Sequence, residues 1–159
     1  METTGFSPIH DAIIEIGAVK VSKGKISDHY SVFVNPQRPI PLRITELTSI
    51  DDSMVADAKS IEEILPEFLS FCEGCSLVAH NAEFDVSFIE ENAKRQGFET
   101  DFTVLDTVQM ARLLLTDLNK FKLNTVCKRL NIKQEHHHRA VDDARVTAEV
   151  FLRFVEMLE

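Results

Sequence analysis

Two long runs of β-branched and apolar residues lie near the start of the chain, separated by only four residues. Residues 12–21 (AIIEIGAVKV) and 26–34 (ISDHYSVFV) flank the segment SKGK. Runs of this composition, joined by a short link that contains glycine, are typical of a β-hairpin. The sequence therefore predicts two antiparallel strands as the first major elements of the fold.

The rest of the chain alternates between helical and strand patterns. A connection with three prolines at residues 35–41 follows the hairpin, and Ser60 and Asn81 are candidate N-caps of the first two helices beyond it. Apolar spacing predicts, in chain order, a helix at 61–72, a strand at 77–79, a helix at 82–96, a strand at 102–105, and helices at 107–115, 123–130 and 140–158. This order predicts an α/β fold in which helices flank a mixed sheet.

Length and charge restrict the class of protein further. A chain of 159 residues with 44% hydrophobic residues suits one domain over residues 1–159. Its net charge of −9 argues against a broad basic surface for nucleic acid. No run of eighteen apolar residues exists, and the first residues lack the basic start and apolar stretch of a signal peptide. We expect a soluble, cytoplasmic protein with no membrane association.

The three cysteines do not form an obvious framework. Cys72, Cys75 and Cys127 are an odd number in a chain without a secretory signal, which favours reduced thiols over disulfides. Cys72 and Cys75 form a C-x-x-C, but a structural zinc site normally needs a second pair of ligands at a suitable distance. We therefore expect ordinary thiols near the end of a helix.

Three acidic residues lie where predicted strands and helices meet. Asp85 is one turn into a helix that follows an apolar strand, Asp143 is in the first turn of the last helix, and Glu2 precedes Thr3 and Thr4. Taken singly, an acid at a helix start is explained by the helix dipole. Three such acids from distant segments, each at an expected sheet edge, instead favour a shared site.

A histidine accompanies the last of these acids. His138 and Asp143 are five residues apart, so on one helix they would point about 140° apart. They converge only if His138 lies in the preceding loop, where an imidazole can accept a proton near neutral pH. Carboxylate oxygens select Mg²⁺ or Mn²⁺, and two such ions can activate water against a phosphodiester. The residues alone thus suggest a two-metal nuclease.

The same segments resemble a known family. ETTG with the following IIEIGAVKV, then HNAEFD at residues 80–85, then HRAVDD at 138–143 are similar to the three motifs of the DEDDh 3′–5′ exonucleases. The segments ITELT at 44–48 and LDT at 105–107 look like the proofreading exonuclease domain of PolC-type DNA polymerase III, with epsilon-type subunits as near relatives. This resemblance implies a ribonuclease-H-like fold and hydrolysis of single-stranded DNA from its 3′ end to 5′-mononucleotides.

The resemblance also implies roles for individual residues. Glu2, Asp85 and Asp143 correspond to ligands of two Mg²⁺ or Mn²⁺ ions, and His138 corresponds to the general base. The residues expected to contact the terminal nucleotide are Thr3, Thr4, Leu47 and Phe84. The expected partner is the polymerase domain or subunit of DNA polymerase III, which would deliver the 3′ end to an acidic chain that has no strong grip on long DNA.

The chain departs from the family pattern at its start. The first family motif is Asp-x-Glu, and counting back from Glu2 puts the Asp immediately before Met1, outside the chain. We accordingly expect the usual first strand to be truncated. Because the resemblance implies that this Asp bridges both ions, we expect the chain on its own to be nearly inactive.

Two other functions fit the same residues. One is an RNA-directed relative such as oligoribonuclease or ribonuclease T, because nothing in the sequence identifies contacts to a 2′-hydroxyl. The other is an impaired module that keeps the fold and binds DNA ends or a polymerase, which the missing Asp would favour. Comparing the degradation of matched DNA and RNA oligonucleotides distinguishes the RNA-directed alternative from the DNA exonuclease. A shift in thermal stability with Mn²⁺ distinguishes an intact metal site from the impaired module.

Overall fold

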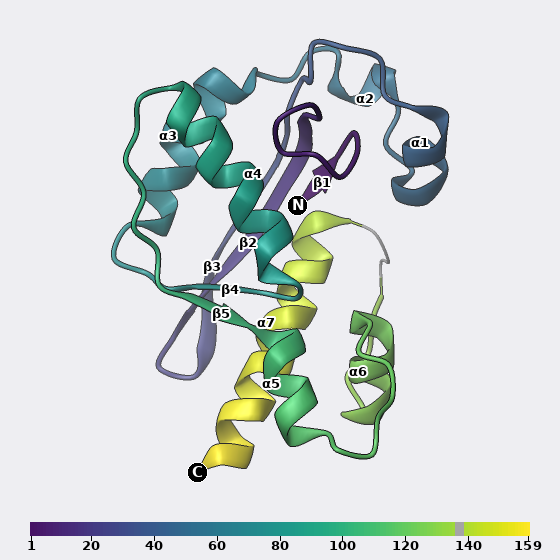
Figure 1. Cartoon of the computed structure of the whole chain (residues 1–159), viewed down its shortest axis with the longest axis vertical. Helices are drawn as coiled ribbons and strands as arrows, with labels where there is room; N and C mark the ends of the chain where they lie inside the picture. Colours follow the sequence, from purple (N-terminus) through teal and green to yellow (C-terminus); the bar gives the residue numbers. More distant parts are fainter. Residues whose placement is uncertain (136–138) are drawn as a thin grey trace.

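A computed structural model of the chain describes residues 1–135 and 139–159. Its elements in chain order, labelled in Figure 1, are β1 (Glu2–Thr3), β2 (Ile13–Ser22), β3 (Lys25–Phe33), α1 (Leu42–Thr48), α2 (Asp52–Val55), α3 (Ile61–Cys72), β4 (Leu77–Ala79), α4 (Ala82–Arg95), β5 (Val104–Asp106), α5 (Thr107–Leu114), α6 (Leu123–Arg129) and α7 (Ala140–Leu158).

The strands form two hydrogen-bonded sheets in the described part of the chain. β1, β2 and β3 make an antiparallel sheet with β2 in the centre, where Glu15 pairs with Glu2 on one side and with Phe33 on the other. β4 and β5 make a separate parallel pair. The predicted mixture of parallel and antiparallel strands is confirmed, but the strands do not form one continuous sheet. β1 has only two residues and β4 and β5 three each, which leaves little backbone for a joining ladder.

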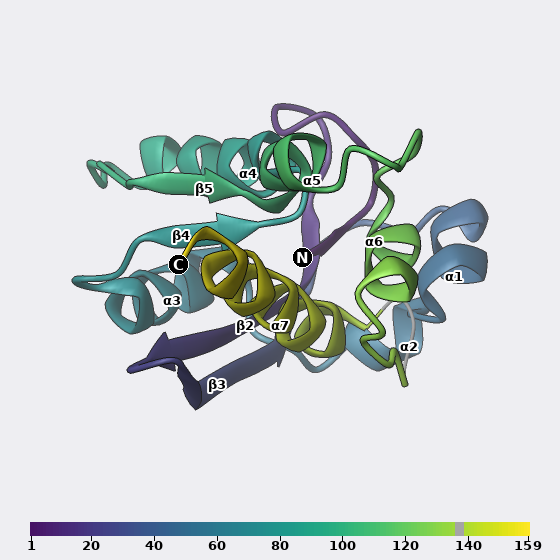
Figure 2. The ribbon, with the colours of Figure 1, turned by 90° about the horizontal axis from the view of Figure 1, so that it is seen from below.

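Helices cover both groups of strands. α7 contacts the β2–β3 hairpin and β4, and it passes between the two groups of strands when the molecule is seen from below (Figure 2). α5 and α6 pack beside α7, and α4 packs on α3, β4 and β5. One apolar core lies between β2, α3 and α4, a second between α5, α6 and α7, and a third under α1 and α2. The mixed α/β architecture with flanking helices is therefore as predicted.

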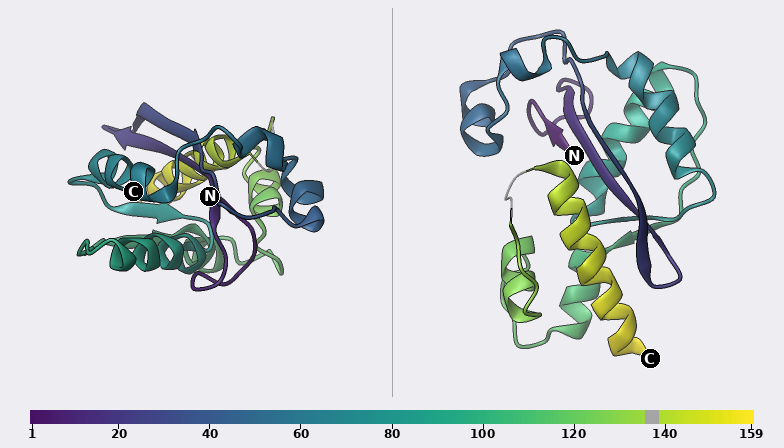
Figure 3. Two further views of the ribbon diagram at one scale, coloured as in Figure 1. Left: turned by 90° about the horizontal axis from the view of Figure 1, so that it is seen from above. Right: turned by 180° about the vertical axis from the view of Figure 1, so that it is seen from behind.

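The start of α7 lies directly on β2, and the two run side by side when viewed from behind (Figure 3). A Cβ atom on Gly17 would lie 2.1 Å from the backbone nitrogen of Val141 and 2.3 Å from the carbonyl carbon of Ala140. Such distances are far below van der Waals contact, so only glycine permits this approach. Gly17 thus fixes how closely the first turn of α7 meets the sheet.

The elements predicted from the sequence are present in the structure, but three further short elements were missed. The predicted strands and helices are all present within one or two residues, whereas β1, α1 and α2 were not predicted. Ser60 and Asn81 occupy the N-cap positions, as predicted, although their side chains make no capping hydrogen bond. For α4 the reason is that a carboxylate from another strand takes the capping role.

The cysteine prediction is confirmed. Cys72 and Cys127 are buried, Cys75 is exposed, and all three are free thiols. Burial raises the pKa of Cys72 and of Cys127 to about 11, which keeps both thiols protonated. Among the described helices, none is long and apolar enough to span a membrane.

Candidate active site

Three of the predicted site residues come together near the amino terminus. Glu2 lies on β1, Asp85 in the first turn of α4, and Asp143 in the first turn of α7. Figure 1 shows the start of the chain beside the first turns of both helices. The three carboxylates are close enough to influence one another's charge, because Asp143 and Asp85 both act on Glu2.

The effect of bringing these carboxylates together is clearest for Glu2. Burial raises the pKa of its carboxyl to about 7, the nearby α-amino group of Met1 opposes the rise, and repulsion by Asp143, Glu15 and Asp85 adds to it. A carboxyl that is buried among like charges favours its protonated form. The site is therefore a concentration of negative charge that a cation would neutralise.

Asp85 shares this environment. Burial raises the pKa of its carboxyl, the α-amino group of Met1 opposes the rise from 3.6 Å away, and the charge of Asp106 adds to it. The cost of removing a carboxylate from water accounts for the main effect. Perturbed carboxyl groups of this kind gather at functional sites.

A fourth acid, Glu15, holds the element that carries Asp143. Its side chain is only 1% exposed. It accepts hydrogen bonds from Arg139 Nε at 3.1 Å, Arg139 Nη2 at 2.9 Å and the backbone nitrogen of Ala140 at 2.8 Å. The guanidinium of Arg139 also lies 5.1 Å from the ring centre of Phe33. Glu15 therefore joins β2 to the start of α7. Glu15 was not predicted as a site residue, although an acid within a β-branched run was a usable signal.

The side chains of the two threonines that follow Glu2 make hydrogen bonds within the loop that begins there. Thr3 Oγ1 donates to the carbonyl of Gly5 at 2.6 Å, and Thr4 Oγ1 both accepts from the backbone nitrogen of Ala12 at 2.9 Å and donates to Asp11 at 3.3 Å. Both side chains are buried. A Cβ on Gly5 would lie 2.4 Å from a carboxylate oxygen of Asp11, so glycine is needed here. The predicted contact of Thr3 and Thr4 with a nucleotide stays a prediction.

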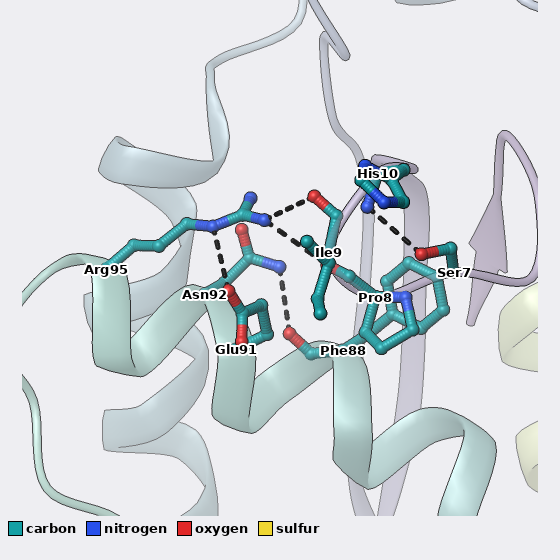
Figure 4. A network of polar contacts seen from close by, with 8 residues as sticks. All are labelled: Ser7, Pro8, Ile9, His10, Phe88, Glu91, Asn92 and Arg95. Atoms are coloured by element: carbon teal, nitrogen blue, oxygen red, sulfur yellow. Dashed lines mark hydrogen bonds and ion pairs between the residues drawn. The ribbon is translucent and has the colours of Figure 1, made fainter.

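An arginine in the last turn of α4 is hydrogen-bonded to the same loop (Figure 4). Arg95 Nη2 donates to the carbonyl of Ile9 at 2.6 Å and to that of Pro8 at 3.4 Å, while its Nε donates to Glu91 at 3.2 Å. Helix α4 thus carries Asp85 in its first turn and fixes the loop after β1 with its last turn.

Two apolar side chains were predicted to contact the last base. Phe84 stands next to Asp85, and its ring lies 5.1 Å from that of Phe88 and 6.4 Å from that of Phe6. Phe6 is 81% exposed, and Leu47, on α1, is 52% exposed. Apolar groups exposed in this way are available to a ligand. The role of Leu47 and Phe84 in binding a base stays a prediction.

The remaining predicted residue, His138, lies outside the described residues, as do His136 and His137. Within residues 1–135 and 139–159, no three His, Cys, Asp or Glu side chains are spaced to hold an ion together. The donor chemistry nevertheless fits a hard divalent cation, because the converging groups are carboxylates, and burial followed by repulsion from Asp143, Glu15 and Asp85 raises the pKa of Glu2. The assignment of Glu2, Asp85 and Asp143 as metal ligands stays a prediction.

The raised pKa of Glu2 predicts how stability depends on pH. Between its ordinary value of 4.5 and about 7, the folded chain keeps a proton that the unfolded chain has released. The free energy of unfolding contributed by Glu2 therefore falls as pH rises through this interval. In a chelating buffer we expect the Tm to decline from about pH 5 to about pH 8, and Glu2→Gln to remove much of the decline. A Glu2→Gln chain with the same slope as the wild type would contradict this account.

A sequence profile of one family matches nearly the whole chain: that of the exonucleases (RNase_T), over residues 1–151. Among curated proteins, the DNA polymerase III PolC-type of Caldanaerobacter subterraneus subsp. tengcongensis is 55% identical over 159 residues, and that of Clostridium perfringens is 54% identical over 150 residues. These matches include 100% and 94% of this chain but only 11% and 10% of the relatives' own lengths.

Solved structures of exonucleases are also similar to this chain. Exonuclease X in complex with 5′-overhanging duplex DNA is 30% identical with a TM-score of 0.78, covering 98% of this chain and 88% of that one. The nuclease domain of 3′hExo, a DEDDh family member bound to rAMP, has a TM-score of 0.81 at 16% identity, covering 92% and 82% of the two chains. Exonuclease I has a TM-score of 0.86 at 15% identity, covering 98% of this chain and 39% of its own. The last two likenesses concern the fold alone.

Proposed function

We propose, since the chain belongs to the exonuclease (RNase_T) family, that it removes nucleotides one at a time from the 3′ end of DNA and proofreads for a PolC-type DNA polymerase III. The observation that carries this proposal is the 55% identity to such a polymerase over the whole chain. The convergence of Glu2, Asp85 and Asp143 supports it independently, because these acids come from three distant segments.

The residues of the site have distinct roles in this proposal. Glu2, Asp85 and Asp143 hold two Mg²⁺ or Mn²⁺ ions through carboxylate oxygens. Such ions, when bound, lower the pKa of water and neutralise charge on a phosphodiester. His138 accepts the proton of the attacking water, which suits an imidazole at neutral pH.

The substrate is a frayed, single-stranded 3′ end. Leu47 and Phe84 contact its last base, and the backbone of Thr3 and Thr4 contacts its terminal nucleotide. The net charge of −9 gives the chain little attraction for long DNA, so the polymerase domain or subunit delivers the end. The PolC relatives are bacterial proteins of replication, and we place the activity in the cytoplasm on that ground.

The test uses a 5′-labelled single-stranded DNA with the chain in excess, so that even slow release of nucleotides is measured. With Mn²⁺ present, we expect products that shorten from the 3′ end by one nucleotide at a time, and with a chelator we expect none. Circular single-stranded DNA is the matched control, because it has no end. Cleavage of the circle, or shortening that persists in the chelator, would refute the proposal.

The RNA-directed alternative is decided by the same assay. A ribonucleotide strand of identical sequence should be shortened more slowly than the DNA, and a clear preference for RNA would favour the alternative. The impaired binding module is tested by thermal unfolding. An acid cluster that binds ions should have a Tm that rises with the Mn²⁺ concentration, because the ion binds only the folded chain. An unchanged Tm together with no nucleotide release would favour the binding module.

A further inference from the structure

The carboxylate of Asp106, at the end of β5, accepts hydrogen bonds from the backbone of two different helices. Its Oδ1 accepts from the nitrogens of Asn81 at 3.0 Å and Val108 at 2.8 Å, and its Oδ2 accepts from that of Ala82 at 3.1 Å. Val108 belongs to α5, whereas Asn81 and Ala82 open α4. We propose that Asp106 is a positioning residue of the nuclease site, which holds the first turn of α4 and with it the carboxylate of Asp85.

The start of α4 needs such support. Asn81 has φ 68° and ψ 61°, a left-handed conformation that costs free energy for residues with a Cβ, although asparagine adopts it more readily than most. Its own side chain makes no capping hydrogen bond, so the first amides of the helix depend on another residue. Asp106 supplies both acceptors from 25 and 24 residues away. The unusual backbone of Asn81 is therefore retained by a carboxylate that lies on a different strand.

The link from Asp106 to Asp85 is short. Asp85 lies in the first turn of α4, three residues after Ala82, whose amide Asp106 holds. A first turn that frays or rotates displaces the side chains that it carries, and displacements of about 1 Å are enough to impair catalysis. Burial is the main cause of the raised pKa of the Asp85 carboxyl, and the negative charge of Asp106 raises it further.

We expect the fold to survive a change of Asp106, because neighbouring contacts join the same two segments. His80 lies between Thr107 and a distant loop: its Nδ1 is 2.8 Å from Thr107 Oγ1, and its Nε2 is 2.6 Å from the carbonyl of Phe121. Thr107 Oγ1 also lies 3.4 Å from the carbonyl of Ala79. These bonds join the end of β4 to the start of α5 without Asp106. The effect of Asp106 can thus be measured in a folded chain.

Asp106→Asn and Asp106→Ala are the informative variants. Asparagine keeps the shape but turns an NH₂ group toward the amide of Ala82, and alanine removes both acceptor oxygens and with them all three hydrogen bonds. The inference rests on the proposed function, so two readouts are measured: the single-turnover rate of nucleotide release with Mn²⁺, and the amide hydrogen exchange of residues 82–85. We expect the maximal rate to fall about 10- to 100-fold, the half-saturating DNA concentration to change less than about two-fold, and exchange to accelerate, more in alanine than in asparagine.

Asp51→Asn is the matched control. Asp51 caps α2 by accepting from the backbone nitrogen of Met54 at 3.0 Å, so Asp51→Asn makes the same loss of charge at the cap of a different helix. We expect it to leave the rate of release and the exchange of residues 82–85 unchanged. Asp106 variants whose rate and exchange match those of Asp51→Asn would overturn the inference.

Two results keep this inference separate from the proposed function. If the chain releases no nucleotides, faster exchange at residues 82–85 in the Asp106 variants still supports the positioning role, and unchanged exchange overturns it. If Asp106→Asn abolishes release while exchange at residues 82–85 is unchanged, Asp106 acts directly in the chemistry and the positioning role is overturned.

Discussion

An Asp85→Asn chain is expected to release nucleotides at least about 1,000-fold more slowly than the wild type while unfolding at nearly the same temperature. A loss of this size corresponds to about 4 kcal/mol of activation free energy. The expectation follows from the proposed function, in which the Asp85 carboxylate holds a cation and an amide oxygen carries no charge to replace it. Single-turnover rates with Mn²⁺ and thermal unfolding with and without the ion measure both quantities.

The small effect on stability has two opposing causes. Burial raises the pKa of Asp85, so its charged form costs free energy in the folded chain, and asparagine removes that cost. The substitution also removes the ionic partner of the α-amino group of Met1, 3.6 Å away. The two contributions have opposite signs, and asparagine keeps the volume of the side chain. We therefore expect this variant to lose activity with little change in stability.

Glu83→Gln is the matched control for Asp85→Asn. Glu83 lies in the same first turn of α4 but is exposed. Removing its charge should change the rate of release by less than about three-fold, because an exposed charge is screened by solvent. Equal losses in the two variants would mean that negative charge on this helix turn, rather than the Asp85 carboxylate itself, supports the activity.

The parts of the fold that the sequence predicted have either long periodic patterns or, like β4 and β5, short apolar runs. The β2–β3 hairpin and α7 repeat their apolar positions over many residues, and their bounds agree with prediction. β1 has two residues and α2 four, which is too short for any period to be seen, and α1 follows directly on Pro41. Their positions depend on packing against β2, which a local pattern does not contain.

The candidate site also contains residues that could be predicted from the sequence and residues that could not. Glu2, Asp85 and Asp143 were predicted because each stands in a motif with a recognisable order. Glu15 and Asp106 were not, because each acts on backbone that is distant in sequence: Glu15 on Arg139 and Ala140, and Asp106 on Asn81 and Ala82. Such supporting contacts arise only when the strands and helices are assembled. The sequence could therefore indicate the chemistry of the site more readily than the scaffold that holds it.

Gly17→Ala tests that scaffold at its tightest point, and we expect it to impair both stability and activity. The added methyl group would lie 2.1 Å from the backbone nitrogen of Val141, where no flexible side chain can move aside. Overpacking of this kind costs about 3 kcal/mol. For a chain of this length, the Tm should fall by roughly 6–12 °C.

The activity of Gly17→Ala should fall with its stability, because the helix that must move is the one that carries Asp143. A displacement of about 1 Å at the start of α7 is expected to slow release about 100-fold, even at temperatures where the variant is fully folded. Gly24→Ala is the control: Gly24 lies between β2 and β3 with φ 77°, and a Cβ there would have no neighbour within 4 Å. Its left-handed conformation should cost about 1 kcal/mol with no change in rate. If Gly17→Ala and Gly24→Ala had the same rate of release, the approach of α7 to β2 would not determine the position of Asp143, and the Glu15 contacts alone would have to hold it.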